Sequence, residues 1–252
     1  MNTIENNNEQ HQPLTSDELR SRVHRFYARY GKEIEQIAEL LQIRLKQLAL
    51  TYTLNNKLPP EAVRVSARVK SIDSFLKKLE NDNWPTFYYP TEVVRDLIGA
   101  RVVCWFVDDV YGMLDCIKAS SHFNISDRPV KDFIKEPQPA GYRAMHVFAN
   151  APYDSVVRGE DGVSVVSKEF LCEIQIRSKL QDAWGDITHE FFYKAKAHGV
   201  AEPALELFLS EVAARLSQED KTLMNFRDVY QRLTDEKTKS GVREGFQSEG
   251  NV

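Results

Sequence analysis

The chain has no apolar run long enough to span a bilayer, and its first residues lack the apolar core of a secretory signal peptide. It has only three cysteines, Cys104, Cys116 and Cys172, and their spacing fits no metal-ligand motif. Cys104 and Cys172 fall in apolar, strand-like runs, so we expect buried, reduced thiols in a cytoplasmic protein. These absences argue against a membrane-spanning chain, a disulfide-stabilised secreted chain and a cysteine-based metal site.

An excess of basic charge is also missing. The 252 residues carry a formal net charge of −4, with 28% charged and 42% apolar residues. No overall positive field would attract nucleic acid, and the composition is ordinary for a soluble globular protein. A chain of this length can bury a full core, so we expect one main domain, residues 15–200, with helical extensions. We find no internal repeat and no adjacent His-Asp pair.

Both ends of the chain are predicted to leave the main domain. Residues 1–14 are polar and rich in Asn and Gln, which predicts a disordered tail. Thr15 and Glu18 have capping-box spacing, and helical periodicity then runs to about Arg29, with a second helix after Gly31. Residues 201–252 predict a helix to about Leu233 and a frayed polar tail after Asp235.

The most informative stretch is Leu171–Arg177, which alternates with a period of two, as a strand does. Ile174 and Ile176 share one face, and the other face carries Glu173, Gln175 and Arg177. A solvated edge strand would alternate in the same way. Because a helix is predicted to begin near Ser178, the polar row should lie at the carboxyl end of a strand, where open α/β sheets bind ligands.

A second group of polar residues lies where residues 63–69, which alternate as a strand, meet an amphipathic helix at 70–79. These residues are Arg68, Lys70, Ser74 and Lys78. A strand leading into a helix N-terminus, with cations and a hydroxyl at the junction, suits a phosphate group. A solvated helix face with routine charges is the alternative.

Asp96 stands at the start of the clearest strand, residues 96–107. The apolar run is continuous, which predicts an interior strand covered on both faces. Asp96 is either a turn or cap residue or a ligand for Mg²⁺, which proteins commonly hold with one or two carboxylates plus substrate phosphates.

Residues 127–141 predict a loop, and the next residues, 141–148, predict a strand. The loop carries the cations Arg128, Lys131 and Lys135, which either close over an anionic ligand or are simply solvated. Alternation places Tyr142, Ala144 and His146 on one side of the strand. The tyrosine and histidine offer a platform for a base and a donor for a phosphate, although a structural Tyr/His pair would have the same spacing.

In chain order these signals form one pattern. It reads Arg68-x-Lys70-x-x-x-Ser74, Asp96-x-x-Gly99-x-Arg101, Asp132-Phe133-Ile134, Gly141-Tyr142-Arg143-x-x-His146, Glu173-x-Gln175-x-Arg177, then Trp184 and Tyr193-Lys194. Over about residues 40–200 this set resembles the synthetase domain of the RelA/SpoT family and, by chain length, its small stand-alone alarmone synthetases.

The resemblance implies an α/β (α+β), nucleotidyltransferase-like synthetase fold. Its mixed sheet of about five strands would be flanked by helices, with helical extensions at both ends. The implied activity is that of a GTP pyrophosphokinase (GTP diphosphokinase), which transfers the β,γ-pyrophosphate of ATP to the 3′-hydroxyl of GDP or GTP. The products would be AMP and (p)ppGpp, the alarmone of the stringent response, and the implied cofactor is Mg²⁺, with Mn²⁺ as a substitute.

The resemblance also assigns roles to residues. The ATP-binding residues would be Arg68 and Arg101 at the adenine, and Lys70, Ser74 and Lys78 at the phosphates. The metal carboxylates would be Asp96 and Glu173, and Glu173 would also accept the 3′-hydroxyl proton. The acceptor nucleotide would be bound by Tyr142, stacking on the guanine, and by Lys131, His146 and Gln175.

Two positions depart from the family pattern: Gln138 replaces a usual Lys, and Phe133 replaces a usual Tyr. The missing lysine removes one acceptor phosphate contact, which the nearby Lys135 could replace, so the preference for GDP or GTP stays open. The resemblance further implies synthesis without hydrolysis, no ribosome partner, and a homo-oligomer, a tetramer by family resemblance. The apolar stripes at 34–48 and 205–216 fit such an assembly and fit packing on the chain's own sheet equally well.

Three functions therefore compete. The first is an alarmone synthetase. The second is a toxic relative that pyrophosphorylates tRNA 3′ ends or adenine nucleotides, which a basic surface near the acceptor site would favour and the acidic overall charge disfavours. The third is a non-catalytic nucleotide-binding module. Intact Asp96 and Glu173 argue against the third, because losing metal carboxylates is the simplest way to lose activity.

Overall fold

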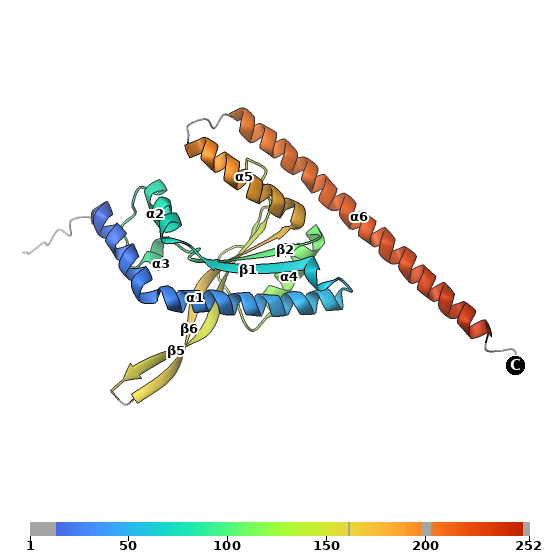
Figure 1. Cartoon of the computed structure of the whole chain (residues 1–252), viewed down its shortest axis with the longest axis horizontal. Helices are drawn as coiled ribbons and strands as arrows, with labels where there is room; N and C mark the ends of the chain where they lie inside the picture. The colour runs from blue at the N-terminus through green and yellow to red at the C-terminus, as the bar shows by residue number, and fades with distance from the viewer. Residues whose placement is uncertain (1–13, 161, 198–202, 249–252) are drawn as a thin grey trace, which may run out of the picture.

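The computed structural model describes residues 14–160, 162–197 and 203–248 (Figure 1). The elements follow in the order α1 (Ser16–Asn55), the 3-10 helix η1 (Pro60–Ala62), β1 (Val63–Val69), α2 (Ile72–Asn81), α3 (Pro90–Val93), β2 (Ile98–Cys104), α4 (Val107–Ala119), β3 (Asn124–Ile125), β4 (Lys131–Asp132), β5 (Met145–Gly159), β6 (Gly162–Ser178), α5 (Lys179–Ala197) and α6 (Pro203–Ser248). Among these helices, none has the length and apolar character needed to cross a membrane.

The strands form one mixed sheet, as expected. Its order is β1-β2-β6-β5-β3, with β4 also pairing on β5, which makes six strands. β2 and β6 run parallel, and the other pairs run antiparallel. The two strands that sequence periodicity could not reveal, β3 and β4, are two residues long, too short to show a period of two.

The two faces of the sheet differ. One face is apolar and buried, with Ile98, Val102, Ile174 and Val147 fully buried, and it packs against α1 and α4. We call the opposite face, which carries the polar side chains, the polar face. In Figure 1, α1 runs along one side of the sheet and α5 lies on the other. The polar face is therefore the part of the sheet that is left for binding and chemistry.

Strand β2 corrects the expectation of a strand covered on both faces. It begins at Ile98, two residues after Asp96, and its residues alternate between buried and half-buried. The half-buried positions include Gly99 and Arg101, which lie on the polar face. The apolar run misled because Val103 is hydrophobic although it occupies a half-buried position of the same alternation.

The N-terminal helices also need correction. α1 is one helix of 40 residues, not two, and it bends along its length (Figure 1). It passes through Gly31 because one glycine inside a helix costs only about 1 kcal/mol, which core packing on either side can offset. The predicted capping box is confirmed. The Thr15 hydroxyl accepts from the backbone N–H of Glu18, and the Glu18 carboxylate accepts from the backbone N–H of Thr15. Leu14, expected in the tail, packs against the core, and residues 1–13 lie outside the described part.

Residues 151–162 lie in a long hairpin. β5 and β6 stay paired out to Gly159 and Gly162, so the strand expected at 141–148 instead starts at Met145 and continues to Gly159. The outer part of this hairpin exposes valines, among them Val156 and Val165. Figure 1 shows it projecting from the body of the sheet.

Helix α6 runs for 46 residues to Ser248, so the frayed tail expected after Asp235 is wrong. The segment after Asp235 contains Glu, Lys and Arg and no proline. Once a helix has nucleated, adding such residues costs little, so polar composition alone did not predict its end.

Candidate active site

The register of the strands places the polar side chains in two rows across the polar face. Residues directly opposite each other on paired strands point to the same face. In one row, Arg68 of β1 lies opposite Gly99 of β2, which lies beside Glu173 of β6. The next row contains Ser66, Arg101, Gln175, His146 and Lys131, one from each of five strands. The two rows join residues that are far apart in sequence.

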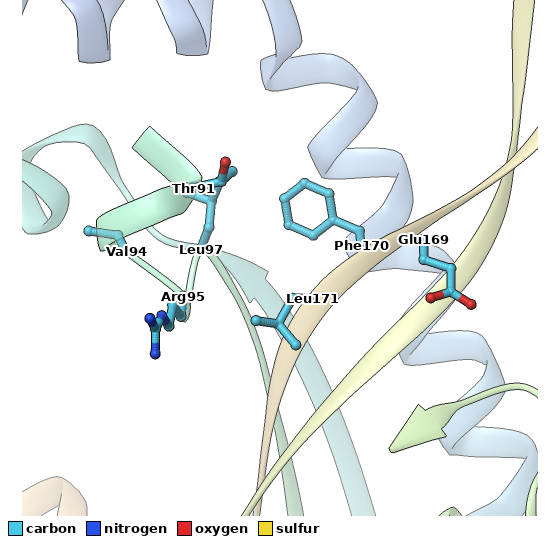
Figure 2. Close-up of a pocket in the computed structure, with 7 residues that line it drawn as sticks. All are labelled: Thr91, Val94, Arg95, Leu97, Glu169, Phe170 and Leu171. Atoms are coloured by element: carbon cyan, nitrogen blue, oxygen red, sulfur yellow. The ribbon is translucent and has the colours of Figure 1, made fainter. Parts of the chain in front are cut away.

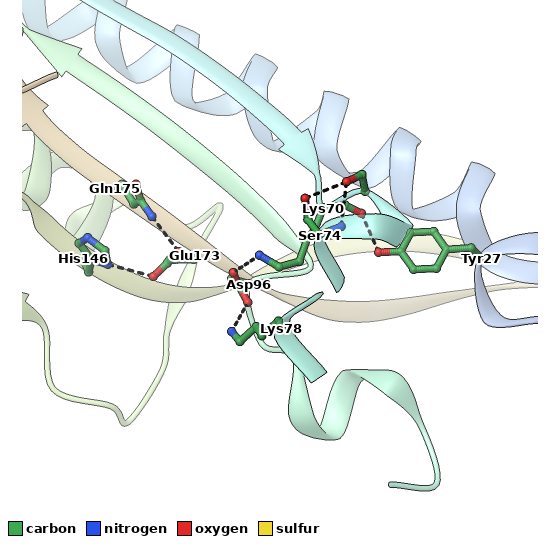
Figure 3. Close-up of polar contacts among 9 residues, drawn as sticks. Tyr27, Lys70, Ser74, Lys78, Asp96, His146, Glu173 and Gln175 are labelled. Carbon is green, nitrogen blue, oxygen red and sulfur yellow. Dashed lines mark hydrogen bonds and ion pairs between the residues drawn. The ribbon is translucent and has the colours of Figure 1, made fainter. Parts of the chain in front are cut away.

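The first cluster, which we call the donor side, forms where β1 passes into α2. The ammonium groups of Lys70 and Lys78 donate to the two carboxylate oxygens of Asp96, at 2.6 Å and 2.8 Å (Figure 3). Ser71 caps α2, and its hydroxyl accepts from the Ser74 backbone and donates to the Ser74 hydroxyl. The helix N-terminus, two hydroxyls and two ammonium groups make a site suited to phosphate.

Tyr27 of α1 holds the donor side in place. Its hydroxyl donates to the carbonyl of Lys70 at 2.6 Å, and the Lys70 amide donates to the carbonyl of Leu97 at 2.8 Å. Its ring packs edge-on against Phe75 of α2, with centroids 6.2 Å apart. Burial, together with the charge of Asp96, raises the pKa of Tyr27, so the hydroxyl stays protonated and able to donate. The sequence did not indicate this role of Tyr27, because the residue looks like one more apolar position of a helix.

The second cluster, which we call the acceptor side, lies on β6 and the start of β5. One Glu173 oxygen is 2.9 Å from His146 Nδ1, and the other accepts from Gln175 Nε2 at 2.9 Å (Figure 3). The Tyr142 hydroxyl lies 2.7 Å from His146 Nε2. Phe133 packs edge-on against the rings of both Tyr142 and His146. Tyr142 precedes β5, but the expected proximity to His146 is confirmed.

Asp96 and Glu173 are both kept ionised. Burial raises the pKa of Asp96, but hydrogen bonds from Lys70 and Lys78 outweigh it and leave the pKa below its usual value. Burial likewise raises the pKa of Glu173, while His146 and Gln175 lower it further than burial raises it. The charge of Asp96 adds a smaller upward effect on the pKa of Glu173, so the two carboxylates lie near enough to interact.

These two carboxylates suit a divalent cation that takes its other ligands elsewhere. In the described ranges, no group of three or more His, Cys, Asp or Glu side chains could hold a metal ion. Mg²⁺ is commonly bound through one or two carboxylates, with water and substrate phosphate oxygens completing its shell. The donor set of Asp96 and Glu173 therefore fits a metal that arrives with a phosphorylated substrate.

Three predicted residues lie outside the two clusters. Arg101 turns toward α5, with its Nη1 2.8 Å from Asp186 and 3.1 Å from Asp182. Arg68 and Lys131 are exposed on the polar face. Trp184 is buried in α5, and the side chains of Tyr193 and Lys194 lie outside the described part.

The site is an open face, and one cavity of the molecule lies close to it. A cavity of about 190 Å³ is lined by Val94, Arg95 and Leu97 on one side and by Glu169, Phe170 and Leu171 on the other (Figure 2). It borders the segment that carries Asp96, but Asp96 does not line it. The polar side chains that could perform chemistry are therefore outside this cavity.

Comparisons with a family model, with curated proteins and with solved structures all find the same kind of protein. Residues 67–198 match a family model described as "Region found in RelA / SpoT proteins". GTP pyrophosphokinase YjbM of Bacillus subtilis is 31% identical over 196 residues, which cover 77% of this chain and 85% of YjbM. GTP pyrophosphokinase YwaC of the same organism is 32% identical over 129 residues, which cover 51% of this chain and 57% of YwaC. The structure of small alarmone synthetase 1 from Bacillus subtilis bound to its product pppGpp matches with a TM-score of 0.64 and 26% identity, covering 84% of this chain and 99% of that one.

Proposed function

We propose a function from one premise: this chain belongs to the RelA/SpoT family. It is a GTP pyrophosphokinase, as two of its relatives are named, and it makes (p)ppGpp. The 3′-oxygen of GDP or GTP bonds to the β-phosphorus of ATP, the bond from that phosphorus to the oxygen bridging to the α-phosphorus breaks, and AMP leaves. The observation that carries the proposal is the pair of ionised carboxylates, with Asp96 in the phosphate-type cluster and Glu173 in the ring-bearing cluster.

The donor side is suited to ATP. Lys70 and Lys78 would neutralise its phosphates, exchanging part of their pairing with Asp96 for phosphate oxygens, and Ser74 would donate from the start of α2. Arg68 and Arg101 would flank the adenine, because a guanidinium plane stacks on rings. Arg101 would then move from Asp186 and Asp182 to the base.

The metal proposed at this site is Mg²⁺, with Mn²⁺ accepting the same oxygen donors. Asp96 and Glu173 would hold it. When bound, the ion would neutralise charge on the transferring phosphates. The lysines beside Asp96 keep that carboxylate ionised and so keep it able to bind a cation.

The acceptor side is suited to the guanine nucleotide. The Tyr142 ring would stack on the guanine, and His146, Gln175 and Lys131 would contact the acceptor. Glu173 would accept the proton of the 3′-hydroxyl, which its lowered pKa leaves it free to do at neutral pH. No observation on the described residues favours tRNA or adenine nucleotides as acceptors, so we propose neither.

Two further properties are proposed with the activity. A homo-oligomer, tetrameric by family resemblance, is supported by apolar side chains exposed on α6, with Phe226 68% and Tyr230 62% exposed. A cytoplasmic location is supported by three free cysteines, two of them buried.

The test is to incubate the purified chain with γ-labelled ATP and Mg²⁺, adding GDP, GTP, ATP or bulk tRNA in turn, and to separate the products. We expect label on GDP or GTP, with one AMP released for each transfer. Omitting the acceptor controls for ATP hydrolysis. Label found only on tRNA or an adenine nucleotide, or no transfer to any acceptor, would contradict the proposal.

A further inference from the structure

Arg177, the last member of the polar row on β6, has a buried guanidinium that is only 3% exposed. Its Nη2 donates to the Gln175 side-chain oxygen at 2.6 Å and to the Tyr142 hydroxyl at 3.0 Å. It has no assigned role among the substrate-binding residues, yet burying an arginine costs free energy unless the charge is well paired.

Two hydrogen-bond branches leave Arg177 and meet at one carboxylate. The first runs through Gln175, whose Nε2 donates to Glu173 Oε2 at 2.9 Å. The second runs through the Tyr142 hydroxyl, 2.7 Å from His146 Nε2, and then from His146 Nδ1 to Glu173 Oε1 at 2.9 Å. Together the five side chains close a ring, which we call the Glu173 ring.

The chemistry of Arg177, of the Glu173 carboxylate and of a neutral His146 together fixes the direction of every bond in this ring. Arginine only donates, so the Gln175 oxygen must face it and the Gln175 nitrogen must face Glu173. The Tyr142 oxygen likewise accepts from Arg177, which leaves its proton for His146 Nε2. A neutral His146 then carries its proton on Nδ1 and donates it to Glu173. Both Glu173 oxygens are thus supplied with donors in a sequence set by Arg177.

The surroundings of Arg177 are shaped to hold it. A Cβ at Gly185 of α5 would lie 2.8 Å from Arg177 Nη1, so the absence of a side chain there makes room for the guanidinium. Asp182 of α5 lies 3.6 Å from the same nitrogen, and the guanidinium lies 5.4 Å from the Tyr142 ring centroid. The helix above β6 therefore fixes Arg177 without occupying its two donor contacts.

We propose that Arg177 is a positioning residue for pyrophosphate transfer, which holds the base Glu173 through Gln175 on one side and through the Tyr142 hydroxyl and His146 on the other. The inference rests on the proposed function and deepens it. The inference gives Tyr142 two separate roles. Its aromatic side chain stacks on the guanine of the acceptor nucleotide, and its hydroxyl takes part in the Glu173 ring. Neither Arg177 nor the hydroxyl needs to touch a substrate.

The test uses two variants of the full chain, Arg177→Met and Tyr142→Phe, in the transfer assay with saturating ATP. Tyr142→Phe keeps the aromatic ring, so kcat should fall about tenfold, the value of one hydrogen bond, while KM for the acceptor stays within about twofold. Arg177→Met breaks both branches, so kcat should fall about a hundredfold, because the loss corresponds to two hydrogen bonds instead of one.

The split between kcat and KM separates positioning from simple damage. Arg177→Met removes the order of the donors to Glu173 but leaves the donor side untouched, so kcat should fall while KM for ATP, measured at saturating acceptor, stays within about twofold. A loss of folded enzyme alone would lower kcat only in proportion to the folded fraction, which circular dichroism measures independently.

Arg227→Met is the matched control, because Arg227 is also a largely buried arginine, but it pairs with Asp108 of α4. Its kcat should stay within about twofold of the parent's. If Arg177→Met does not fold, Tyr142→Phe decides by its split between kcat and KM. Unchanged kcat in the variants, with an active parent, would overturn the positioning role alone. A parent chain that transfers nothing to GDP or GTP would overturn the proposed function and the inference with it.

Discussion

The donor and acceptor sides of the polar face are built from different interactions. On the donor side, Lys70 and Lys78 form ion pairs with Asp96, and all three lie on segments that flank strands or on a helix. On the acceptor side, Glu173 and Gln175 lie on β6 and His146 on β5, joined by directional hydrogen bonds. The first set is organised by charge and the second by geometry.

This difference matches what each side is proposed to do. An ammonium group can exchange a carboxylate for a phosphate oxygen without a precise angle, so ion pairs suit a site that receives a highly charged nucleotide. A base must meet its proton at hydrogen-bond distance and in a fixed orientation, so neighbouring strands and a closed set of donors suit Glu173. We infer that the donor side rearranges on binding and that the acceptor side is ready beforehand.

The largest effect should come from breaking the acceptor side at its centre. Glu173→Gln removes the proposed proton acceptor but keeps the shape of the side chain, so turnover should fall by about a thousandfold. ATP binding should be largely intact, because the donor cations do not depend on Glu173. Single-turnover transfer and equilibrium ATP binding measure the two effects, and a fully active Glu173→Gln protein would show that another group is the base.

A smaller effect should come from loosening the donor side at its support. Tyr27→Phe removes the hydroxyl that holds the Lys70 carbonyl, so KM for ATP should rise about three- to tenfold, in line with one hydrogen bond of about 1 kcal/mol. KM for the acceptor should not change. Tyr30→Phe, on the same helix, is the matched control, and equal effects on both substrates in Tyr27→Phe would show that the two sides are not independent.

The smallest effect should be a pH-dependent difference in stability at Asp96. Because its folded pKa is lowered by the two lysines, the charged form stabilises the fold above its unfolded pKa of about 4. That contribution should vanish as the pH falls through the folded pKa. The unfolding free energy of the parent should exceed that of Asp96→Asn by about 1 kcal/mol or less at pH 7, and the gap should close in acid.

Asp220 of α6 provides a control of opposite sign. It accepts from Ser178 and Gln181, but burial raises its pKa. Its charged form therefore costs stability, so the parent should lose stability relative to Asp220→Asn as the pH rises above about 4. Denaturant titrations over a pH series measure the difference in unfolding free energy between the parent and each variant. If both differences changed with pH in the same direction, the opposite pKa shifts assigned to Asp96 and Asp220 would be refuted.

Much of the candidate site could be predicted from the sequence because its residues lie in short periodic segments. The alternation in Leu171–Arg177 correctly separated the buried isoleucines from the polar row, and β1 was expected over the seven residues it occupies. The donor residues were expected at a strand-to-helix junction, which is where they lie. Boundaries were less accurate, as β2 and α6 show, because hydrophobicity and polarity do not mark where pairing or helical growth stops.

The sequence by itself determined most of the long helices and strands, the order of the motifs and the residues on each face of β6, since helix and strand periods are set by backbone geometry over a few residues. Only the tertiary structure decided which of these residues meet. Tyr27 reaches a carbonyl 43 residues away, and Arg101 pairs with an acid 85 residues away. Such contacts depend on strand order, register and helix placement, which arise from packing the whole chain and leave no periodic trace in any one segment.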